Sequence, residues 1–252
     1  MAKGLHGEGD RAHELASLAS PRGTLTAPER GGTATEPWYH VAKAVALPPL
    51  RFWFRLSYEH LDRIPRSGPA IVACNHISYL DPLTNGDAVV RARRRPRFLA
   101  KEDLFKIPFV GRALRGAGQI PVSRGTRDRS SLDLAIAALD RGEVIVVYPE
   151  GTVTRRDDGL PMEGKTGLVR VAIASGVPII PMASWGSRAV WQKSGRGSLK
   201  FGRPIWTRVG EPISLPAEPD GVELRALTAE VMDAITRLVV DLRDRYPRRW
   251  TK

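Results

Sequence analysis

The sequence contains a single cysteine, Cys74, among 252 residues. One cysteine cannot form an internal disulfide, so a small fold held by disulfide bridges is excluded, and a reducing compartment fits the composition. A cysteine nucleophile has to be considered, because Asn75 and His76 follow Cys74 directly. The position of Cys74 at the end of an apolar run favours a small buried core residue instead.

The sequence also lacks a long apolar run. A membrane-spanning helix needs about 20 mainly apolar residues. The most apolar stretch, residues 37–58, is interrupted by Lys43, Arg51 and Arg55. No apolar segment follows the first residues of the chain, which argues against a secretory signal peptide.

Acidic residues are fewer than basic ones, 27 against 39, which gives a formal net charge of +12. This balance favours acidic partners: nucleic acid, anionic lipid surfaces or phosphorylated small molecules. A nucleic-acid-binding protein is expected to interleave basic and aromatic side chains along one binding face. Here the aromatic residues concentrate before Tyr58. We therefore expect no nucleic-acid partner.

Several common site motifs are absent. Gly111 and Gly116 have the spacing of a P-loop, but Ala117 stands where that motif requires lysine. Ser184 lacks the preceding glycine of a nucleophile elbow, because Met182 occupies that position. The third glycine of a dinucleotide-binding loop is missing, and the histidines and the cysteine have no zinc-ligand spacing. We expect no resident metal or cofactor.

The composition divides the chain into three parts. Residues 1–36 are rich in Gly, Ala, Thr and charge and are predicted to form a disordered tail. Residues 37–60 are the most aromatic, and Pro48 and Pro49 predict two short amphipathic helices there. Such helices suit a membrane interface, with Trp at headgroup depth and Arg toward anionic lipid. The alternative is that they pack on the core of the domain formed by residues 61–252.

Strand patterns alternate with helix patterns from Ile71 to Met182, and Val144–Tyr148 is the clearest buried strand. This alternation predicts an α/β fold in which helices cover a mostly parallel central sheet. One or two further strands are expected within residues 199–213. Apolar residues at helical spacing from Leu224 to Leu242 predict a long amphipathic helix.

A turn after the predicted strand at Ile71 contains the first candidate site. His76 lies in this turn, and Asp81-Pro82 follows as the expected start of a helix, with Asp81 as N-cap. Strand ends of this kind are the usual place for a site in an open α/β sheet. A carboxylate that reaches an imidazole fixes its tautomer and stabilises its charged form, so the other ring nitrogen becomes a better base. The alternative is a plain helix cap beside a structural histidine.

Four segments follow one another in a specific order. They are Asn75-His76-x4-Asp81, Gly118–Arg124, Tyr148–Thr152 and Val177–Pro181. Together they resemble the glycerolipid acyltransferases of the 1-acylglycerol-3-phosphate acyltransferase (lysophosphatidic acid acyltransferase) family. The resemblance covers about residues 65–213. Each segment alone is a weak signal, whereas all four in this order are a strong one.

The resemblance implies a reaction. The chain would transfer an acyl chain from acyl-CoA to the free hydroxyl of 1-acylglycerol 3-phosphate, giving phosphatidic acid in phospholipid synthesis. His76 would be the general base, and Asp81 would orient the imidazole and stabilise its charged form. The co-substrate would be a thioester of coenzyme A or of acyl carrier protein. No covalent acyl-enzyme would be needed.

The resemblance also implies an acceptor site. It would be lined by Arg124, Glu150, Gly151 and Thr152, with Lys101 and Lys165 adding positive charge. A guanidinium suits bidentate binding of phosphate. Glu150 would orient Arg124 or the glycerol hydroxyl, and Gly151 would allow close approach of the backbone. The alternative is a surface charge at Arg124 and an ordinary turn at Gly151-Thr152.

Some features leave the specificity open. Pro121-Val122-Ser123 precedes Arg124, where many family members have Phe-Ile-Asp or Phe-Val-Arg. The acceptor could therefore be glycerol 3-phosphate or another lysophospholipid. A thioester or lipid hydrolase that uses His76 with water is a further alternative, and it would need no acceptor phosphate site. The expected location is the cytoplasmic face of the cell membrane, as a peripheral protein in contact with anionic lipid.

Overall fold

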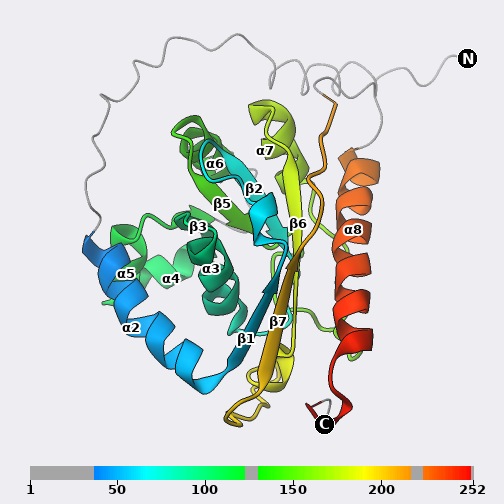
Figure 1. The fold of residues 1–252 in the computed structure, drawn as a ribbon. Coiled ribbons are helices and arrows are strands. Elements are labelled where there is room, and N and C mark those ends of the chain that lie inside the picture. The colour runs from blue at the N-terminus through cyan, green and yellow to red at the C-terminus, as the bar shows by residue number, and fades with distance from the viewer. Residues whose placement is uncertain (1–36, 123–129, 217–223, 251–252) are drawn as a thin grey trace, which may run out of the picture. The chain divides into compact units, whose positions relative to one another are not determined.

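A computed structural model describes residues 37–122, 130–216 and 224–250. The predicted disordered tail, residues 1–36, lies outside the described residues. The described chain forms one seven-stranded sheet with the order β1-β7-β6-β2-β5-β3-β4 (Figure 1). The strands are β1 (Arg55–Glu59), β2 (Ala70–Cys74), β3 (Pro96–Lys101), β4 (Ile120–Val122), β5 (Val144–Val147), β6 (Ile179–Trp185) and β7 (Pro204–Val209).

Most neighbouring strands are parallel, and only β6 and β7 pair antiparallel in the described sheet. The predicted α/β fold with a mostly parallel sheet is confirmed. The helices are α2 (Pro37–Trp53), α3 (Asp81–Arg91), α4 (Glu102–Lys106), α5 (Val110–Gly116), α6 (Ser130–Asp140), α7 (Gly167–Ser175) and α8 (Leu224–Arg245). Short 3-10 turns are η1 (Leu61–Arg63), η2 (Ser187–Ala189) and η3 (Arg248–Trp250).

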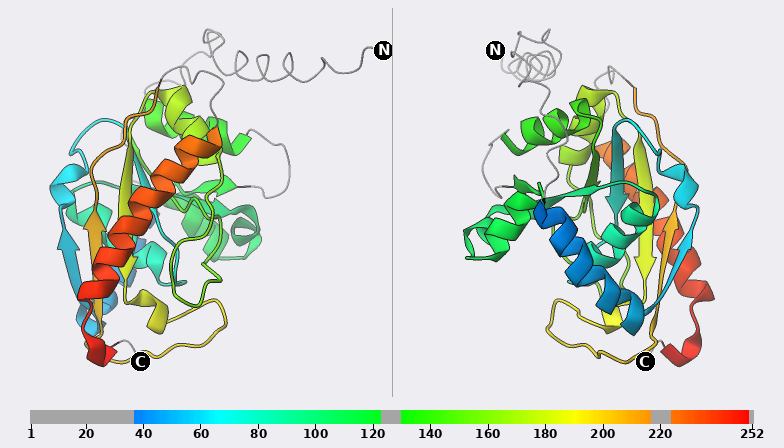
Figure 2. Two further views of the ribbon diagram at one scale, coloured as in Figure 1. Left: turned by 90° about the vertical axis from the view of Figure 1, so that its right-hand side faces the viewer. Right: turned by 60° about the vertical axis from the view of Figure 1, so that its left-hand side comes forward.

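Helices cover both faces of the sheet, so its central strands are apolar on both sides. In β2, Ile71 and Ala73 pack with α6, α7 and α8, while Val72 and Cys74 pack with α3 on the opposite face. Figures 1 and 2 show α8 along one face and α3 on the other. Cys74 is fully buried, and burial raises the pKa of its thiol well above the ordinary value. The prediction of a core cysteine is confirmed.

The N-terminal region differs from the sequence prediction. A single 17-residue helix, α2, contains both Pro48 and Pro49, so the prediction of two short helices is wrong. The prolines remove hydrogen bonds only from the carbonyls of Ala44 and Val45, and these residues are exposed to water. Burial of the other side of the helix, at Leu47, Leu50 and the adjoining Phe54, keeps it continuous.

Residues 55–59, expected to be helical, form the edge strand β1. A buried carboxylate joins this region to the rest of the fold. Asp87 of α3 accepts hydrogen bonds from Arg51 of α2 (2.9 Å), Tyr58 of β1 (2.6 Å) and Arg91 (3.0 Å). Burial alone would raise the pKa of Asp87, but these three donors hold it below its ordinary value. The network anchors α2 and β1 to the helix that begins at Asp81.

No helix within residues 37–122, 130–216 and 224–250 is both long enough and apolar enough to span a bilayer.

Candidate active site

Three neighbouring parallel strands, β5, β2 and β6, end at the same edge of the sheet. The turn after β2 contains His76, the loop after β5 contains Glu150, and the turn after β6 contains Ser187. Residues far apart in the sequence therefore meet at the carboxyl edge, where open α/β sheets usually bind ligands.

Asp81 is the first residue of α3 and is fully buried. Its Oδ2 atom accepts hydrogen bonds from the backbone N–H groups of Ile77 (2.6 Å) and Ser78 (2.7 Å) and lies 2.9 Å from His76 Nδ1. The prediction that Asp81 caps its own helix is wrong, because Leu80 occupies the N-cap position. The carboxylate instead fixes the preceding turn, which holds the imidazole beside it.

The imidazole of His76 has two partners, the carboxylate of Asp81 and the ring of Tyr148. Its Nδ1 faces the acceptor-only carboxylate of Asp81, so Nδ1 carries the proton and Nε2 keeps its lone pair. Its ring stacks on Tyr148, with 4.1 Å between centroids and 19° between planes. Asn85 Nδ2 donates to the Tyr148 hydroxyl (3.2 Å). Burial raises the pKa of Tyr148 well above its ordinary value, so the phenol stays neutral beside the imidazole.

Ser187, which the sequence analysis did not single out, completes the environment of Asp81. Its hydroxyl donates to Asp81 Oδ1 at 2.6 Å, and both side chains are fully buried. The carboxylate therefore has four partners, one hydroxyl, two backbone N–H groups and one imidazole. The 106 positions between Ser187 and Asp81 hide this contact in the sequence. The sequence offered one signal for it: Ser187 follows the strand that begins at Val177–Pro181, the fourth segment of the family resemblance.

Glu150 is held by backbone groups of two loops. It is 4% exposed, and its two carboxylate oxygens accept from the backbone N–H groups of His76 (3.0 Å) and Met162 (2.9 Å). Burial raises its pKa, and these two donors offset part of that effect. Glu150 therefore fastens the turn of His76 to the loop after β5. Arg124, which it was expected to orient, lies outside the described residues.

The remaining predicted residues lie around one cavity. Gly151 has a φ of +68°, and a Cβ atom there would lie 3.1 Å from Lys165 Nζ. Thr152 Oγ1 accepts from Lys193 Nζ at 2.9 Å. Lys101 forms an ion pair with Asp103. His76, Gly151, Thr152, Lys101 and Lys165 all line this cavity.

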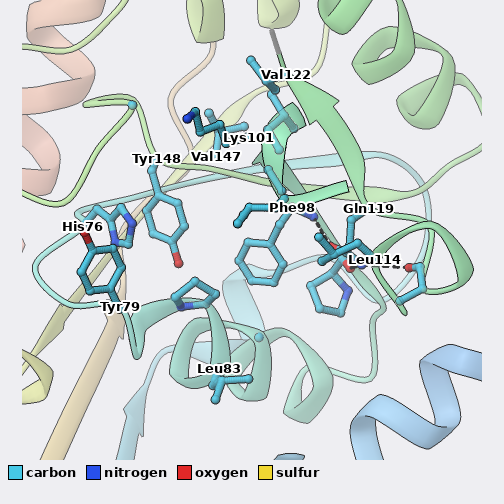
Figure 3. Close-up of a pocket in the computed structure, with 18 of the residues that line it drawn as sticks. His76, Tyr79, Leu83, Phe98, Lys101, Leu114, Gln119, Val122, Val147 and Tyr148 are labelled. Carbon is cyan, nitrogen blue, oxygen red and sulfur yellow. Dashed lines mark hydrogen bonds between the residues drawn. The ribbon is translucent and has the colours of Figure 1, made fainter. Parts of the chain in front are cut away.

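The cavity has a volume of about 1080 Å³ and extends away from His76 between α2, α3, α5 and β3. Figure 3 shows His76 and Tyr79 at one side of it and Phe98, Leu83 and Leu114 farther in. Its lining is mainly apolar, although polar side chains such as Lys43 and Gln119 also line it away from His76. The apolar part includes Leu47, Leu83, Val90, Phe98, Leu99, Leu104, Val110 and Leu114.

The arrangement allows one kind of chemistry in particular. A histidine with one nitrogen bonded to a buried carboxylate and the other available can take a proton from a hydroxyl or from water. The adjoining apolar cavity can hold a hydrocarbon chain. Among the residues that the structure describes, no group of three or more His, Cys, Asp or Glu side chains could hold a metal ion.

Comparisons with known proteins agree with this geometry. The chain is 28% identical over 200 residues to chloroplastic 1-acyl-sn-glycerol-3-phosphate acyltransferase LPAT1 of Arabidopsis thaliana, an alignment that covers 77% of this chain and 54% of that protein. It is 28% identical to 1-acyl-sn-glycerol-3-phosphate acyltransferase of Bacillus subtilis over 146 residues, 57% of this chain and 70% of that one. The chain thus spans about half of the plant relative.

The fold matches the crystal structure of the 1-acyl-sn-glycerophosphate (LPA) acyltransferase PlsC from Thermotoga maritima. The TM-score is 0.61 at 23% identity, and the match covers 97% of this chain and 86% of that one. A family model described as Acyltransferase matches residues 55–185, which include β1, the turn of His76, the loop of Glu150 and all of β6. The chain belongs to the Acyltransferase family.

Proposed function

We propose that this acyltransferase transfers the acyl chain of acyl-CoA to the free hydroxyl of 1-acylglycerol 3-phosphate, giving phosphatidic acid in phospholipid synthesis. The observation that carries the proposal is the His76–Asp81 pair at the edge of a large apolar cavity. The names of the Arabidopsis and Bacillus relatives, both 1-acyl-sn-glycerol-3-phosphate acyltransferases, support the choice of acceptor.

The proposed reaction is a direct transfer. Nε2 of His76 takes the proton of the acceptor hydroxyl while its oxygen attacks the thioester carbonyl. The imidazolium then forms beside the Asp81 carboxylate, which lies 2.9 Å from Nδ1 and stabilises the positive charge. Collapse of the tetrahedral intermediate breaks the C–S bond, and the leaving thiolate takes the proton from His76. The products are the ester and the free thiol, with no acyl-enzyme.

The cavity fits the apolar part of such substrates. Ligand pockets have volumes of about 300–1,000 Å³, and the volume of this cavity, about 1080 Å³, lies just above that range. Leu83, Phe98 and Leu114 would contact the hydrocarbon chain away from His76. Each methylene group buried against the apolar lining contributes about 0.8 kcal/mol to the binding free energy, which favours long acyl chains.

The acceptor phosphate would bind on the side of Gly151 and Lys101. Lys165 supplies an ammonium group close to the backbone of Gly151, and Thr152 supplies a hydroxyl. Arg124 would add bidentate bonds to the phosphate. Glu150 would act as a positioning residue, because its carboxylate oxygens accept from backbone groups of the two loops.

We also propose that the chain works at the cytoplasmic face of a membrane. The outer side of α2 exposes an apolar stripe formed by Val41, Val45 and Phe52. The ring of Phe201 packs against that of Phe52, with 5.7 Å between the centroids and 56° between the planes. Lys43 lies on the same helix and is exposed. Apolar and aromatic side chains beside cations are typical of a surface that binds anionic lipid.

A vesicle assay tests this location. Replacing Phe52 and Phe201 together with Ser should weaken co-sedimentation with anionic vesicles roughly tenfold or more, since burying a phenylalanine contributes about 1.5–3 kcal/mol. Leu134→Ser, which changes an exposed leucine of α6, serves as the control. Equal binding of all three proteins would remove the role of this surface.

The activity assay supplies palmitoyl-CoA with and without lysophosphatidic acid and follows both thiol release and lipid mass. We expect acceptor-dependent release and a phosphatidic acid product. His76→Ala should lower the rate by about 10²–10⁴-fold, the usual contribution of a positioned base. Glycerol 3-phosphate and other lysophospholipids are tested in parallel as acceptors.

Release that ignores the acceptor would indicate a hydrolase instead. Arg124→Ala separates the two reactions further. It should raise the KM for lysophosphatidic acid in a transferase and leave a hydrolase largely unchanged. No release with any acceptor or carrier would contradict the proposed activity.

A further inference from the structure

The segment that follows β6 is fastened to the candidate active site at three points. Ser187 donates to Asp81, as described above. The carbonyl of Trp191 accepts from the Ser78 hydroxyl (2.7 Å) and from the backbone N–H of Tyr79 (3.1 Å). Lys193 donates to the Thr152 hydroxyl. Residues 187–193 therefore lie across the turn of His76 and reach the loop after β5.

These contacts place two exposed aromatic rings side by side next to the site. The rings of Tyr79 and Trp191 are 5.4 Å apart at 59°, and they are 46% and 54% exposed. Tyr79 also lines the cavity, and Figure 3 shows it beside His76. Exposed aromatic rings held by backbone hydrogen bonds provide a stacking platform for a planar base.

The same segment supplies positive charge. Lys193 and Arg196 are both exposed and lie two and five positions after Trp191. The nearby carboxylates Asp157 and Asp158 already pair with Arg188 and Arg156. The segment from Trp191 to Arg196 contains no acidic residue. Cations beside aromatic rings match a ligand that combines a base with phosphates.

We infer that Tyr79, Trp191 and Lys193 bind the nucleotide end of an acyl-coenzyme A donor. This inference rests on the proposed function. With the acyl chain in the apolar cavity and the thioester at His76, the carrier must leave toward solvent, and the lining residues Tyr79 and Thr152 are both at least partly exposed there. The flexible pantetheine arm allows the adenine of coenzyme A to stack on Tyr79 and Trp191. The phosphates of the nucleotide then lie near Lys193 and Arg196.

The test compares two donors with the same acyl chain, palmitoyl-CoA and palmitoyl-pantetheine, in detergent. For Trp191→Ala, the KM for palmitoyl-CoA should rise roughly 5- to 150-fold, the range that stacking on one base provides. The KM for palmitoyl-pantetheine should not change. Lys193→Ala should show the same selectivity with a smaller effect. Leu134→Ala and Arg225→Ala remove an exposed apolar side chain and an exposed cation elsewhere and serve as controls.

Calorimetric titration with coenzyme A gives a readout that does not depend on turnover. We expect saturable binding to the wild type and to Leu134→Ala, and much weaker binding to Trp191→Ala. Equal KM changes for both donors, or unchanged binding, would overturn the inference. A Trp191→Ala defect that occurs only with vesicles would overturn it too, because it would indicate contact with lipid.

The two proposals fail in different ways. Transfer without any effect of Trp191→Ala on palmitoyl-CoA would refute the nucleotide site and leave the proposed function standing. Binding of coenzyme A that depends on Trp191, in a protein that transfers no acyl group, would refute the proposed function and leave the nucleotide site standing.

Discussion

Asp81→Asn separates the charge of the proposed catalytic pair from its shape. The amide oxygen can take the place of Oδ2 and accept from Ile77, Ser78 and His76. The amide NH₂ then faces the Ser187 hydroxyl, which lies 2.6 Å from Oδ1 in the wild type. A hydroxyl can accept as well as donate, so Ser187 adapts by rotating its proton. The variant should therefore keep the fold.

The expected magnitudes follow from these four contacts. A hydrogen bond to a charged group contributes roughly 1.5–3 kcal/mol and a neutral one roughly 0.5–1.5, so four bonds lose about 4–6 kcal/mol in all. The buried carboxylate carries a desolvation cost of several kcal/mol, which asparagine avoids. The net change in the free energy of unfolding should stay within about 2 kcal/mol. The transfer rate should fall by about 10²–10⁴-fold, or about 3–5 kcal/mol in the barrier, because the imidazolium loses its counter-charge.

Two measurements on the same protein check this prediction. Urea unfolding gives the free energy of unfolding, and initial rates of thiol release with lysophosphatidic acid give the activity. Asp140→Asn, which neutralises an exposed carboxylate of α6, should change neither. A folded Asp81→Asn protein whose rate stays within about threefold of wild type would show that His76 does not depend on this charge.

Three further predictions concern the surroundings of this pair. Ser187→Ala leaves Asp81 Oδ1 without its donor, so the free energy of unfolding should fall by about 1.5–3 kcal/mol, and kcat should fall while the KM for the acceptor stays unchanged. The control Ser175→Ala removes a hydroxyl that donates within α7 and should keep kcat, so equal kcat values in the two variants would contradict the role of Ser187. Gly151→Ala and Gly176→Ala both place alanine at a positive φ, +68° and +67°, so each variant should lose about 1–2 kcal/mol of stability. Only the new methyl group of Gly151→Ala contacts Lys165, so only this variant should raise the KM for the acceptor, and equal KM values would argue against a phosphate site there. Because the pKa of Glu150 is raised, the folded state holds this proton more tightly than the unfolded state, and the wild type should lose stability as the pH rises from 4.5 through the raised pKa. Urea unfolding at several pH values should show this decline for the wild type and not for Glu150→Gln.

The fold was largely predictable because its patterns are local. Apolar runs and capped helical stretches indicated the strands and helices from Ile71 to Met182, and the family-like segments indicated His76 and Asp81. α2 was misjudged because proline rules describe a helix by itself, whereas α2 is held by packing at Leu47 and Leu50. β1 was missed because its pairing with β7 depends on a partner far along the chain.

The finer geometry of the site could not be predicted for the same reason. Asp81 accepts hydrogen bonds from two backbone N–H groups of its own turn and from the hydroxyl of Ser187. This set of donors depends on how the carboxyl ends of β2 and β6 meet. Glu150 was expected to orient Arg124 or the glycerol hydroxyl, and local sequence does not reveal that the backbone N–H groups of His76 and Met162 lie opposite its carboxylate. Residue types could therefore be assigned to the site, whereas their partners required the three-dimensional arrangement.

The position of β1 has a consequence for biosynthesis. This edge strand pairs with β7 in the described sheet, and Arg55 faces Pro204, about 150 residues later in the chain. A ribosome that adds about 5–20 residues per second needs roughly 8–30 s to cover this interval. Until then β1 has an open edge, and α2 has no completed sheet to pack against. The N-terminal part of the folded unit is made early and becomes native late, so nascent chains arrested before residue 204 should be cleaved by proteases at α2 and β1.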